Sequence, residues 1–402
     1  MQHTILWVFF WSGASLILYV YFVFPLFLAF LARWVPRRSP SDQRFLPQVT
    51  LLISAFNERT VIEGKVKNSL SLEYPSDRLE ILVISDCSDD GTDDVVRGYS
   101  SQGVQLVRQM ERLGKSAGLN LGVSKGTGEI IVFSDANAIY RPDAIRQLVK
   151  HFTDPKVGYV VGNARYVESA SAAPAVASEG LYWRLETWLK RKESEFGSVV
   201  GGDGAIYAIR RELFSPLEPT DINDLLNPLQ IIVLGYQGVY EPYAICYEEA
   251  GGSFEREFGR KVRIISRSLN AIRRASKVLL PWTQPRHWFC LLSHKVLRWL
   301  IPVFLIMTLL TSLLLWPFLL YRFFAILQLG FYALASAGWL LGEKRGSSRF
   351  LYLPYYFCLV NVASLFGLVK FFRGTLSPTW ETVRHGGQPE QKTVASKTRK
   401  DS

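Results

Sequence analysis

The stretch IIVFSDAN, at residues 130–137, decides how this chain is expected to fold. Its first four residues are apolar and suit a strand buried on both faces, whereas Asp135 and Asn137 are polar and follow directly. A second stretch, ILVISDCS at residues 81–88, repeats this change from an apolar run to a polar cluster. In a parallel α/β sheet, such clusters lie at the carboxyl ends of the strands, where ligands bind. The two stretches therefore predict a sheet of this kind with a ligand site at one edge.

Apolar runs of strand length recur through the central region and alternate with helical patterns. This alternation predicts an α/β fold with a doubly wound, mostly parallel sheet. After about residue 174 long helical patterns dominate. We therefore expect one domain at 45–285, made of a first half at 49–161 and a second half at 162–280. The predicted strands cover residues 49–56, 79–84, 104–107, 130–133 and 157–161, and residues 239–247 predict one more, isolated strand.

Long uncharged stretches flank this domain. Residues 5–31 carry no charge and exceed the roughly 20 residues that a membrane-spanning helix needs. A cleaved signal peptide is the alternative, but residues 1–4 contain no Lys or Arg and the apolar run is too long. Three more runs follow the domain, so we expect an integral membrane protein. These runs cover residues 299–321, 323–341 and 350–369.

The resulting plan has an N-terminal anchor with a basic linker at 1–44, a transmembrane region at 286–373 and a polar, basic tail at 374–402. Basic residues that follow the first span place the central domain in the cytoplasm. Three C-terminal crossings would then export the tail, although it is rich in Lys and Arg. Either one apolar run is re-entrant or interfacial, or the charge rule does not hold for this chain.

Cysteine spacing and net charge exclude several classes of protein. The four cysteines are widely spaced and form no C-x-x-C, so neither a thiolate metal site nor a disulfide framework is expected. Much of the net charge of +11 lies in membrane-proximal segments. We therefore expect membrane lipid as a partner and no nucleic acid, since the chain has no helix-turn-helix or aromatic-basic RNA motif.

Three features of the first half suit a nucleotide. Residues 54–58, SAFNE, close the first strand with small side chains that let a flat ring approach, although any strand-to-helix turn has this composition. Asp86 can accept a hydrogen bond from a base N–H or can be a turn residue, and for Asp89 and Asp90 we favour helix capping. Lys115 starts a helix beside glycines, which suits a diphosphate, although a solvated lysine explains it equally well.

Asp135 and Asn137 are the candidate metal ligands. Because they lie two residues apart at a strand end, their side chains project in the same direction. They could hold one Mg²⁺ or Mn²⁺ through oxygen, with diphosphate oxygens completing the coordination shell. The alternative is an ordinary turn that ends the strand.

Two charged clusters follow in the second half. Asn223-Asp224 precedes a helical run at 225–234, where an acid most often caps the helix. Residues 254–280 predict a basic amphipathic helix that carries Arg260 and Arg263. Such a helix can lie on the membrane surface, can present its arginines to a leaving diphosphate, or can do both.

Taken together, these clusters resemble those of the membrane-bound family 2 glycosyltransferases, which include cellulose, hyaluronan and poly-N-acetylglucosamine synthases. The resemblance covers about residues 48–267. It implies a GT-A-like domain whose first half binds a nucleotide-sugar, usually UDP-linked, and whose second half binds the acceptor. The resemblance assigns Ala55, Asn57, Glu58, Asp86 and Lys115 to the nucleotide-sugar, Asp135 to nucleotide and metal, Asn137 to the metal, Asp224 to the catalytic base, Arg260 and Arg263 to the diphosphate, and Gly202 and Asp203 to the acceptor-side loop.

Two departures from the family's pattern bear on the product. Asn223 stands where the family has an acid before Asp224. The arginine motif reads RKVRI at 260–264, with Ile264 in place of the tryptophan that borders the acceptor sugar in processive synthases. We therefore expect the addition of one or a few sugars to a lipid-linked or membrane-proximal acceptor.

The expected activity is that of an inverting glycosyltransferase that uses Mg²⁺ or Mn²⁺ in polysaccharide, glycolipid or cell-envelope biosynthesis. Asp224 would take the proton from an acceptor hydroxyl. One alternative is a single-sugar transferase to polyprenyl phosphate, but a phosphate acceptor needs no base. The other is a non-catalytic membrane scaffold or export component, against which the complete, ordered set of charged clusters argues.

Overall fold

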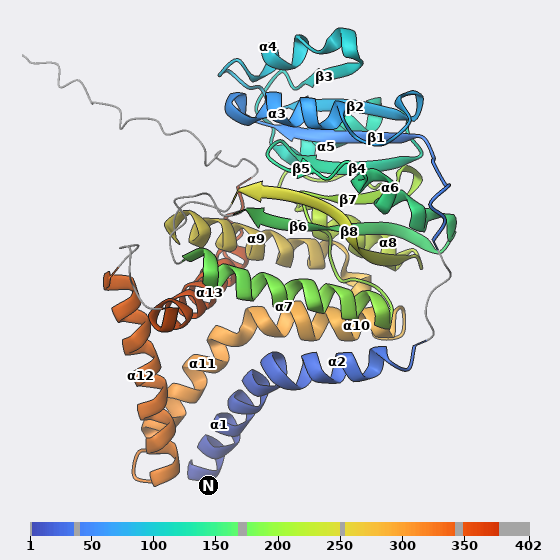
Figure 1. Ribbon diagram of the computed structural model, residues 1–402. Helices are drawn as coiled ribbons and strands as arrows, with labels where there is room; N and C mark the ends of the chain where they lie inside the picture. The colour runs from blue at the N-terminus through green and yellow to red at the C-terminus, as the bar shows by residue number, and fades with distance from the viewer. Residues whose placement is uncertain (1, 36–40, 168–174, 250–253, 342–348, 378–402) are drawn as a thin grey trace, which may run out of the picture.

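The computed structural model describes residues 2–35, 41–167, 175–249, 254–341 and 349–377 (Figure 1). The tail from residue 378 onward lies outside the described residues. Within them, eight strands form one sheet in the order β3-β2-β1-β4-β7-β6-β8-β5. The strands are β1 Val49–Ala55, β2 Leu79–Ser85, β3 Val104–Arg108, β4 Ile130–Asp135, β5 Ile139–Tyr140, β6 Val157–Val167, β7 Tyr207–Arg210 and β8 Gln237–Glu249.

The sheet is mixed but mostly parallel, which confirms the predicted fold class. Strands β1, β2, β3 and β4 pair in parallel, and β6 pairs in parallel with β8. Only β7, inserted between β4 and β6, and the short β5 run in the opposite direction. The register pairs Ser54 with Asp135 and Ala55 with Ser85. The polar clusters that follow these strands therefore meet at one edge, as the sequence predicts.

Helices cover both faces of the sheet because its strands alternate their apolar side chains. Leu51 and Ile53 face one core, which α3, α4 and α6 cover, whereas Leu52 faces the other, which α2, α5, α7, α8 and α9 cover. One sheet thus joins the two predicted halves. The helices of the domain are α3 Arg59–Leu70, α4 Thr92–Arg97, α5 Lys115–Lys125, α6 Ala144–Val149, α7 Ala175–Phe196, α8 Asn223–Val233 and α9 Phe254–Arg274.

Four helical stretches of the described residues are long and apolar enough to cross a membrane. They lie beside the second core, below the sheet in Figure 1. The first stretch comprises α1 (Gln2–Leu18) and α2 (Phe24–Ala32), and the second comprises α10 (Pro285–Cys290) and α11 (Leu297–Leu314). The other two are α12 (Leu319–Leu341) and α13 (Arg349–Phe372).

The first two stretches change direction at π-helical turns. These turns are Tyr19–Val23, between α1 and α2, and Leu291–Val296, between α10 and α11. The Tyr19 hydroxyl lies 2.8 Å from Ser293 Oγ, so a hydrogen bond joins the two turns. Beyond them α1 and α11 descend away from the domain, whereas α2 and α10 run beneath it (Figure 1). A π-turn is a recognised cause of a helix bend.

Helix α13 follows a different course from α1, α11 and α12. It stays close to the central domain, at the level of α9 (Figure 1). Near its start, Tyr355 packs edge-on against Phe254, with ring centroids 4.7 Å apart. Near its end, Phe366 contacts Phe258 at 5.7 Å. The two helices therefore lie side by side along much of their length.

Candidate active site

Three of the predicted site residues converge on Gly204, in the loop before β7. A methyl group placed on Gly204 would lie 3.4 Å from Asp224 Oδ2 and 3.7 Å from both Asp135 Oδ2 and Lys115 Nζ. These side chains come from α8, the end of β4 and the start of α5. Glycine at position 204 leaves this centre open. Its importance is not evident from the sequence, where it is one of several glycines in the stretch GGDG at 201–204.

Asp224 lies in the first turn of α8, yet it does not cap the helix. Within the described ranges, no residue donates a hydrogen bond to its carboxylate. Burial raises the pKa of Asp224, the charge of Lys115 lowers it, and the like charges of Asp203 and Asp135 raise it, so the pKa is raised overall. A carboxylate without a hydrogen-bond partner and with a raised pKa suits a general base.

Asn223 explains how α8 holds Asp224. Its side-chain amide donates to the Tyr207 hydroxyl at 2.7 Å, and the Asn227 amide donates to the same oxygen at 3.1 Å. Tyr207 belongs to β7, so these bonds tie the first turns of α8 to the sheet. The Asp224 backbone carbonyl also accepts a hydrogen bond from Gly202 N at 2.5 Å. The departure from the family's acid at position 223 thus supplies a neutral anchor for the helix that carries Asp224.

Asp135 and Lys115 form an ion pair, with Lys115 Nζ 2.5 Å from Asp135 Oδ1. Both side chains are partly exposed, as is Asn137. No group of three or more His, Cys, Asp or Glu residues that could hold a metal occurs in the described part of the chain. One carboxylate and one amide nevertheless fit a Mg²⁺ or Mn²⁺ ion that takes its remaining ligands from water and from a substrate diphosphate. The donor set therefore fits a metal that arrives with the nucleotide.

Asp86 is buried at the end of β2 and orders the loop before Lys115. Its Oδ1 accepts hydrogen bonds from Gln109 Nε2 at 2.6 Å and from the backbone N–H groups of Leu113 and Gly114 at 3.0 Å. Burial raises the pKa of Asp86, although these two backbone N–H groups lower it in part. The structure therefore gives Asp86 a local structural role beside its predicted role toward the base.

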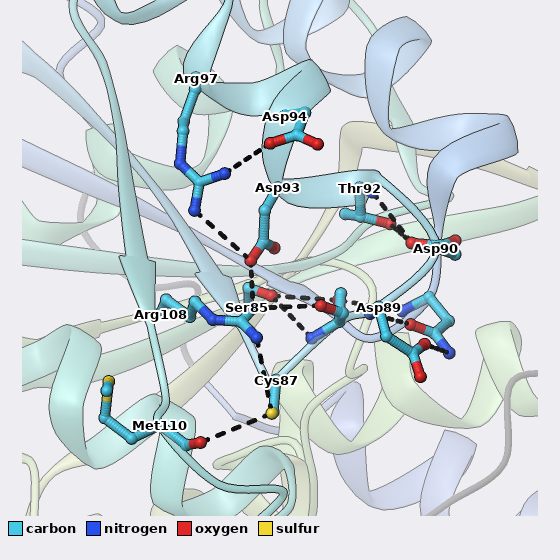
Figure 2. A network of polar contacts seen from close by, with 12 residues as sticks. Ser85, Cys87, Asp89, Asp90, Thr92, Asp93, Asp94, Arg97, Arg108 and Met110 are labelled. Atoms are coloured by element: carbon cyan, nitrogen blue, oxygen red, sulfur yellow. Dashed lines mark hydrogen bonds and ion pairs between the residues drawn. The ribbon is translucent and has the colours of Figure 1, made fainter.

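The segment after β2 is held to the end of β1 by a polar network (Figure 2). Asn57, whose backbone is left-handed with φ of 53°, exchanges two hydrogen bonds with Asp89, at 2.8 and 3.0 Å. Asp90 accepts the backbone N–H of Thr92 at 2.9 Å, but Gly91 holds the N-cap position of α4. Neither Asp89 nor Asp90 is therefore the N-cap residue that the sequence favours. The Ala55 carbonyl accepts Asp86 N, and Glu58 N donates to the Thr92 hydroxyl. This network gives the predicted nucleoside side of the site a fixed shape.

The two predicted arginines on α9 differ in their surroundings. Arg260 makes a two-point ion pair with Glu257 on the same helix, at 2.7 and 2.9 Å. Arg263 instead lies in the field of Asp135 and Asp224. Burial and the charge of Arg260 lower the pKa of Arg263, whereas those two carboxylates raise it. The pKa of Arg263 is lowered overall, and of the two arginines it is the one whose charge Asp135 and Asp224 stabilise.

Asp203, the predicted acceptor-side acid, is paired with Lys190 of α7, whose Nζ lies 3.0 Å from its Oδ2. Gly202 borders a cavity of about 690 Å³ that also contacts Asp224. Two kinds of wall enclose this cavity. The central domain contributes α7, α8, α9 and the loop at 201–202. The apolar helices contribute Tyr21, Arg298, Trp299 and the face of α13 that carries Leu353, Tyr356 and Asn361.

A buried polar bridge, which sequence reasoning missed, joins α7 to the membrane helices beside this cavity. His294 lies 2.6 Å from Glu193 Oε1 and 3.2 Å from Glu186 Oε1. Lys295 and Arg298 also pair with Glu186. Although burial acts to raise the pKa of Glu186, these positive charges hold it well below its usual range. Glu193 in turn accepts Val200 N at 3.1 Å, so the bridge reaches the loop that carries Gly202.

Comparisons with known proteins concern the family and the fold of the central domain. Residues 50–217 match Glycosyl transferase family 2, and the central domain belongs to that family. A probable glycosyltransferase of Bacillus subtilis, YdaM, is 30% identical over 223 residues, or 52% of each chain. A poly-β-1,6-N-acetyl-D-glucosamine synthase of Staphylococcus epidermidis is 24% identical over 226 residues, or 54% of each chain. The match thus spans about half the length of these relatives.

Among solved structures, the mannosyltransferase PcManGT from Pyrobaculum calidifontis, in complex with GDP-Man and Mn²⁺, has a similar fold. The TM-score is 0.67 at 22% identity, over 92% of this chain and 99% of that one. This match confirms a GT-A-like domain combined with apolar helices. The chain therefore combines a central domain of glycosyltransferase family 2, with a GT-A-like fold, and candidate membrane helices at both ends of that domain.

Proposed function

We propose that the protein is a metal-dependent, inverting hexosyltransferase or N-acetylhexosaminyltransferase that moves a sugar from a UDP-linked donor to a hydroxyl group of a membrane lipid or lipid-linked sugar. The observation that carries this proposal is the convergence of Asp224, Asp135 and Lys115 on the space beside Gly204. A base without a hydrogen-bond partner thus borders the same space as the groups that suit a diphosphate.

The proposed reaction is a single displacement. Asp224 accepts the proton of the acceptor hydroxyl as its oxygen attacks the anomeric carbon and the bond to the diphosphate breaks. Lys115 and Arg263 stabilise the negative charge that develops on the leaving diphosphate. Asp135 and Asn137 would hold a Mg²⁺ or Mn²⁺ ion, which neutralises part of the diphosphate charge when bound. Attack from the face opposite the leaving group inverts the configuration at the anomeric carbon.

The cavity beside Asp224 supports a lipid acceptor. One wall is polar and carries the proposed base, whereas the other is built from the apolar helices and includes Tyr21, Trp299 and Leu353. A lipid with a hydroxyl-bearing head group matches both walls. A polyprenyl phosphate fits less well, because a phosphate oxygen attacks without a base and would lie beside the Asp224 carboxylate.

The catalytic domain is proposed to lie in the cytoplasm. Both ends of α13 contact α9, which packs on the sheet through Ile265 and Ile272. Beyond α13, the Ser377 carbonyl accepts a hydrogen bond from Arg267 of α9. A helix that stays beside the domain along its length cannot cross a hydrocarbon core about 30 Å thick. The chain then crosses three times, through α1, α11 and α12, and the basic tail returns to the cytoplasm, in accord with the positive-inside rule.

Two experiments test this proposal. Membranes that contain the protein are incubated with a panel of labelled nucleotide-sugars, and lipid extracts are analysed by mass spectrometry. We expect label in a lipid product with one donor and none with an Asp224→Asn variant. Label in neither the lipid nor any polymer would favour the scaffold alternative. A reporter fused after Ser402 tests the topology: cytoplasmic signal is expected, and a periplasmic or extracellular signal would show that α13 crosses the membrane.

A further inference from the structure

Lys65 of α3 is a buried amine that the reaction above does not use. Its side chain is 0% exposed, and among the described residues no carboxylate lies within ion-pairing distance. Burial lowers the pKa of Lys65 to about 7, against the opposing effects of Cys246, Asp135 and Glu248. Burying an amine without a paired charge is costly, so the position calls for an explanation beyond packing.

The amine contacts the segment that follows the candidate metal ligands. Lys65 Nζ donates to the Ala138 carbonyl at 2.5 Å and lies 3.8 Å from the centroid of the Tyr140 ring. Ala138 follows Asn137 directly, and its N–H closes a turn by donating to the Asp135 carbonyl at 3.2 Å. The side chain of Lys65 therefore fixes the end of the turn that presents Asp135 and Asn137.

Asn68, one helical turn further along α3, holds the next residues of the same segment. Its Nδ2 donates to the Tyr140 carbonyl at 2.8 Å, and its Oδ1 accepts Tyr140 N at 2.7 Å. The Tyr140 hydroxyl in turn donates to the carbonyls of Phe133 and Ala205, at 3.2 and 3.0 Å. Phe133 lies in the strand before Asp135, and Ala205 follows Gly204. The contacts thus connect α3 to both sides of the charged centre.

We propose that Lys65, supported by Asn68, is a positioning residue that holds Asp135 and Asn137 in the geometry needed for a metal–diphosphate complex. This inference rests on the proposed function, because it assumes that these two residues meet a metal-bound nucleotide. A hydrocarbon side chain would fill the same space without the cost of burying an amine. What the amine adds is the bond to the Ala138 carbonyl, which no apolar residue can make.

The test compares Lys65→Met, which keeps the length of the side chain and removes the amine, with Lys67→Met on the same helix. Lys67 is exposed and pairs with Glu63 only at the surface, so its variant is a matched control. In the purified protein without metal, hydrogen exchange at the Ala138 and Tyr140 amides should become about tenfold faster in Lys65→Met, the effect of losing one hydrogen bond. Exchange in β1 and β2 should stay as in the parent, and the melting temperature should not fall, because the variant also removes the cost of burying an amine.

The second measurement is the affinity for uridine diphosphate by calorimetry, with and without Mn²⁺. We expect Lys65→Met to weaken binding about tenfold only when Mn²⁺ is present, and Lys67→Met to change neither value. Unchanged exchange at Ala138 together with unchanged Mn²⁺-dependent affinity would overturn the proposal. A lower melting temperature with unaltered affinity would overturn it as well and would make Lys65 a packing residue.

If Lys65→Met does not accumulate in the cell, the same two measurements are made on Asn68→Ala. This variant leaves the buried amine in place and removes both hydrogen bonds to the Tyr140 backbone. Its exchange at Tyr140 should rise and its Mn²⁺-dependent affinity should fall, and parent-like values for both would overturn the proposal. Measurements on the parent protein distinguish the proposed function from the positioning role of Lys65. Absence of Mn²⁺-dependent nucleotide binding in the parent would refute the proposed function, whereas the exchange comparison would still decide whether Lys65 fixes the turn.

Discussion

Asp224→Asn is the variant that most directly separates binding from chemistry. The substitution keeps the size of the side chain and removes its charge and basicity. Because no described residue bonds to the Asp224 carboxylate, the change breaks no hydrogen bond in the fold. The helix remains anchored through Asn223 and Tyr207. Loss of a general base lowers turnover by about 10²–10⁴, which corresponds to about 2.7–5.4 kcal/mol of transition-state stabilisation.

Nucleotide affinity should respond differently. Asp224 is a like charge beside Asp135 and the expected diphosphate, so its removal should leave the donor KM within about threefold of the parent value. The assay is transfer from a labelled nucleotide-sugar in membranes, with kcat and KM measured separately. Glu218→Gln is a matched carboxylate-to-amide control, since Glu218 is 60% exposed and pairs with Arg274 outside the cavity.

The pH dependence adds a second criterion. A base must be deprotonated to act, so kcat/KM of the parent should rise with pH through the pKa of Asp224. Because burial raises that pKa, the rise should occur at a higher pH than for an ordinary aspartate. In Asp224→Asn this rise of kcat/KM with pH should disappear. A variant that folds normally and retains near-parental turnover would refute the assignment of Asp224 as base. So would a variant whose kcat/KM rises over the same pH range as that of the parent.

Three further outcomes are expected. Excess chelator should abolish transfer and added Mg²⁺ or Mn²⁺ should restore it, while Asp135→Ala should weaken nucleotide binding only when metal is present; full activity in chelator would contradict the metal assignment. Gly204→Ala should reduce turnover at least about tenfold with little change in melting temperature. The added methyl group would lie 3.4 Å from Asp224 Oδ2 and would occupy the space between the reacting groups. Parental activity would show that the methyl group does not obstruct the substrates. Products should carry one or a few sugars, since Ile264 replaces the family's tryptophan, and mass spectrometry showing an early high-molecular-weight polymer would contradict this.

The sequence predicted the strands that surround the nucleotide side well, because each is a continuous apolar run. Residues 49–56, 79–84 and 130–133 correspond closely to β1, β2 and β4. It did not predict the short strand β7 (Tyr207–Arg210), which pairs antiparallel with β4 and β6. Nor did it place β8 next to β6, because such a pairing depends on contacts between segments about 80 residues apart. The basic helix ends at Arg274 rather than near residue 280.

Prediction of the site had similar limits. Asp135, Lys115 and Asp224 were found because each is polar at a strand end or a helix start, and these positions have a local signature. Gly204 and His294 have none, since their importance lies in what the fold places beside them. Lys65 has a local signature, because it lies on the buried side of α3 with Ile62 and Ser69, where a charged residue is unexpected. A lysine at an apolar position of a helix was a signal that could have been used.

The hydrogen bond between the π-helical turns at Tyr19 and Ser293 bears on how far the central domain lies from the membrane. If α1 and α11 cross the membrane, the adjacent bends, and not the total length of the apolar helices, would set the height of the charged centre above the bilayer. Below them, α1 and α11 have 17 and 18 residues, or about 25–27 Å of helix. A thicker or thinner bilayer can then be met by tilting these segments. The distance from Asp224 to the lipid head groups would stay constant, so the same acceptor could be reached in membranes of different composition.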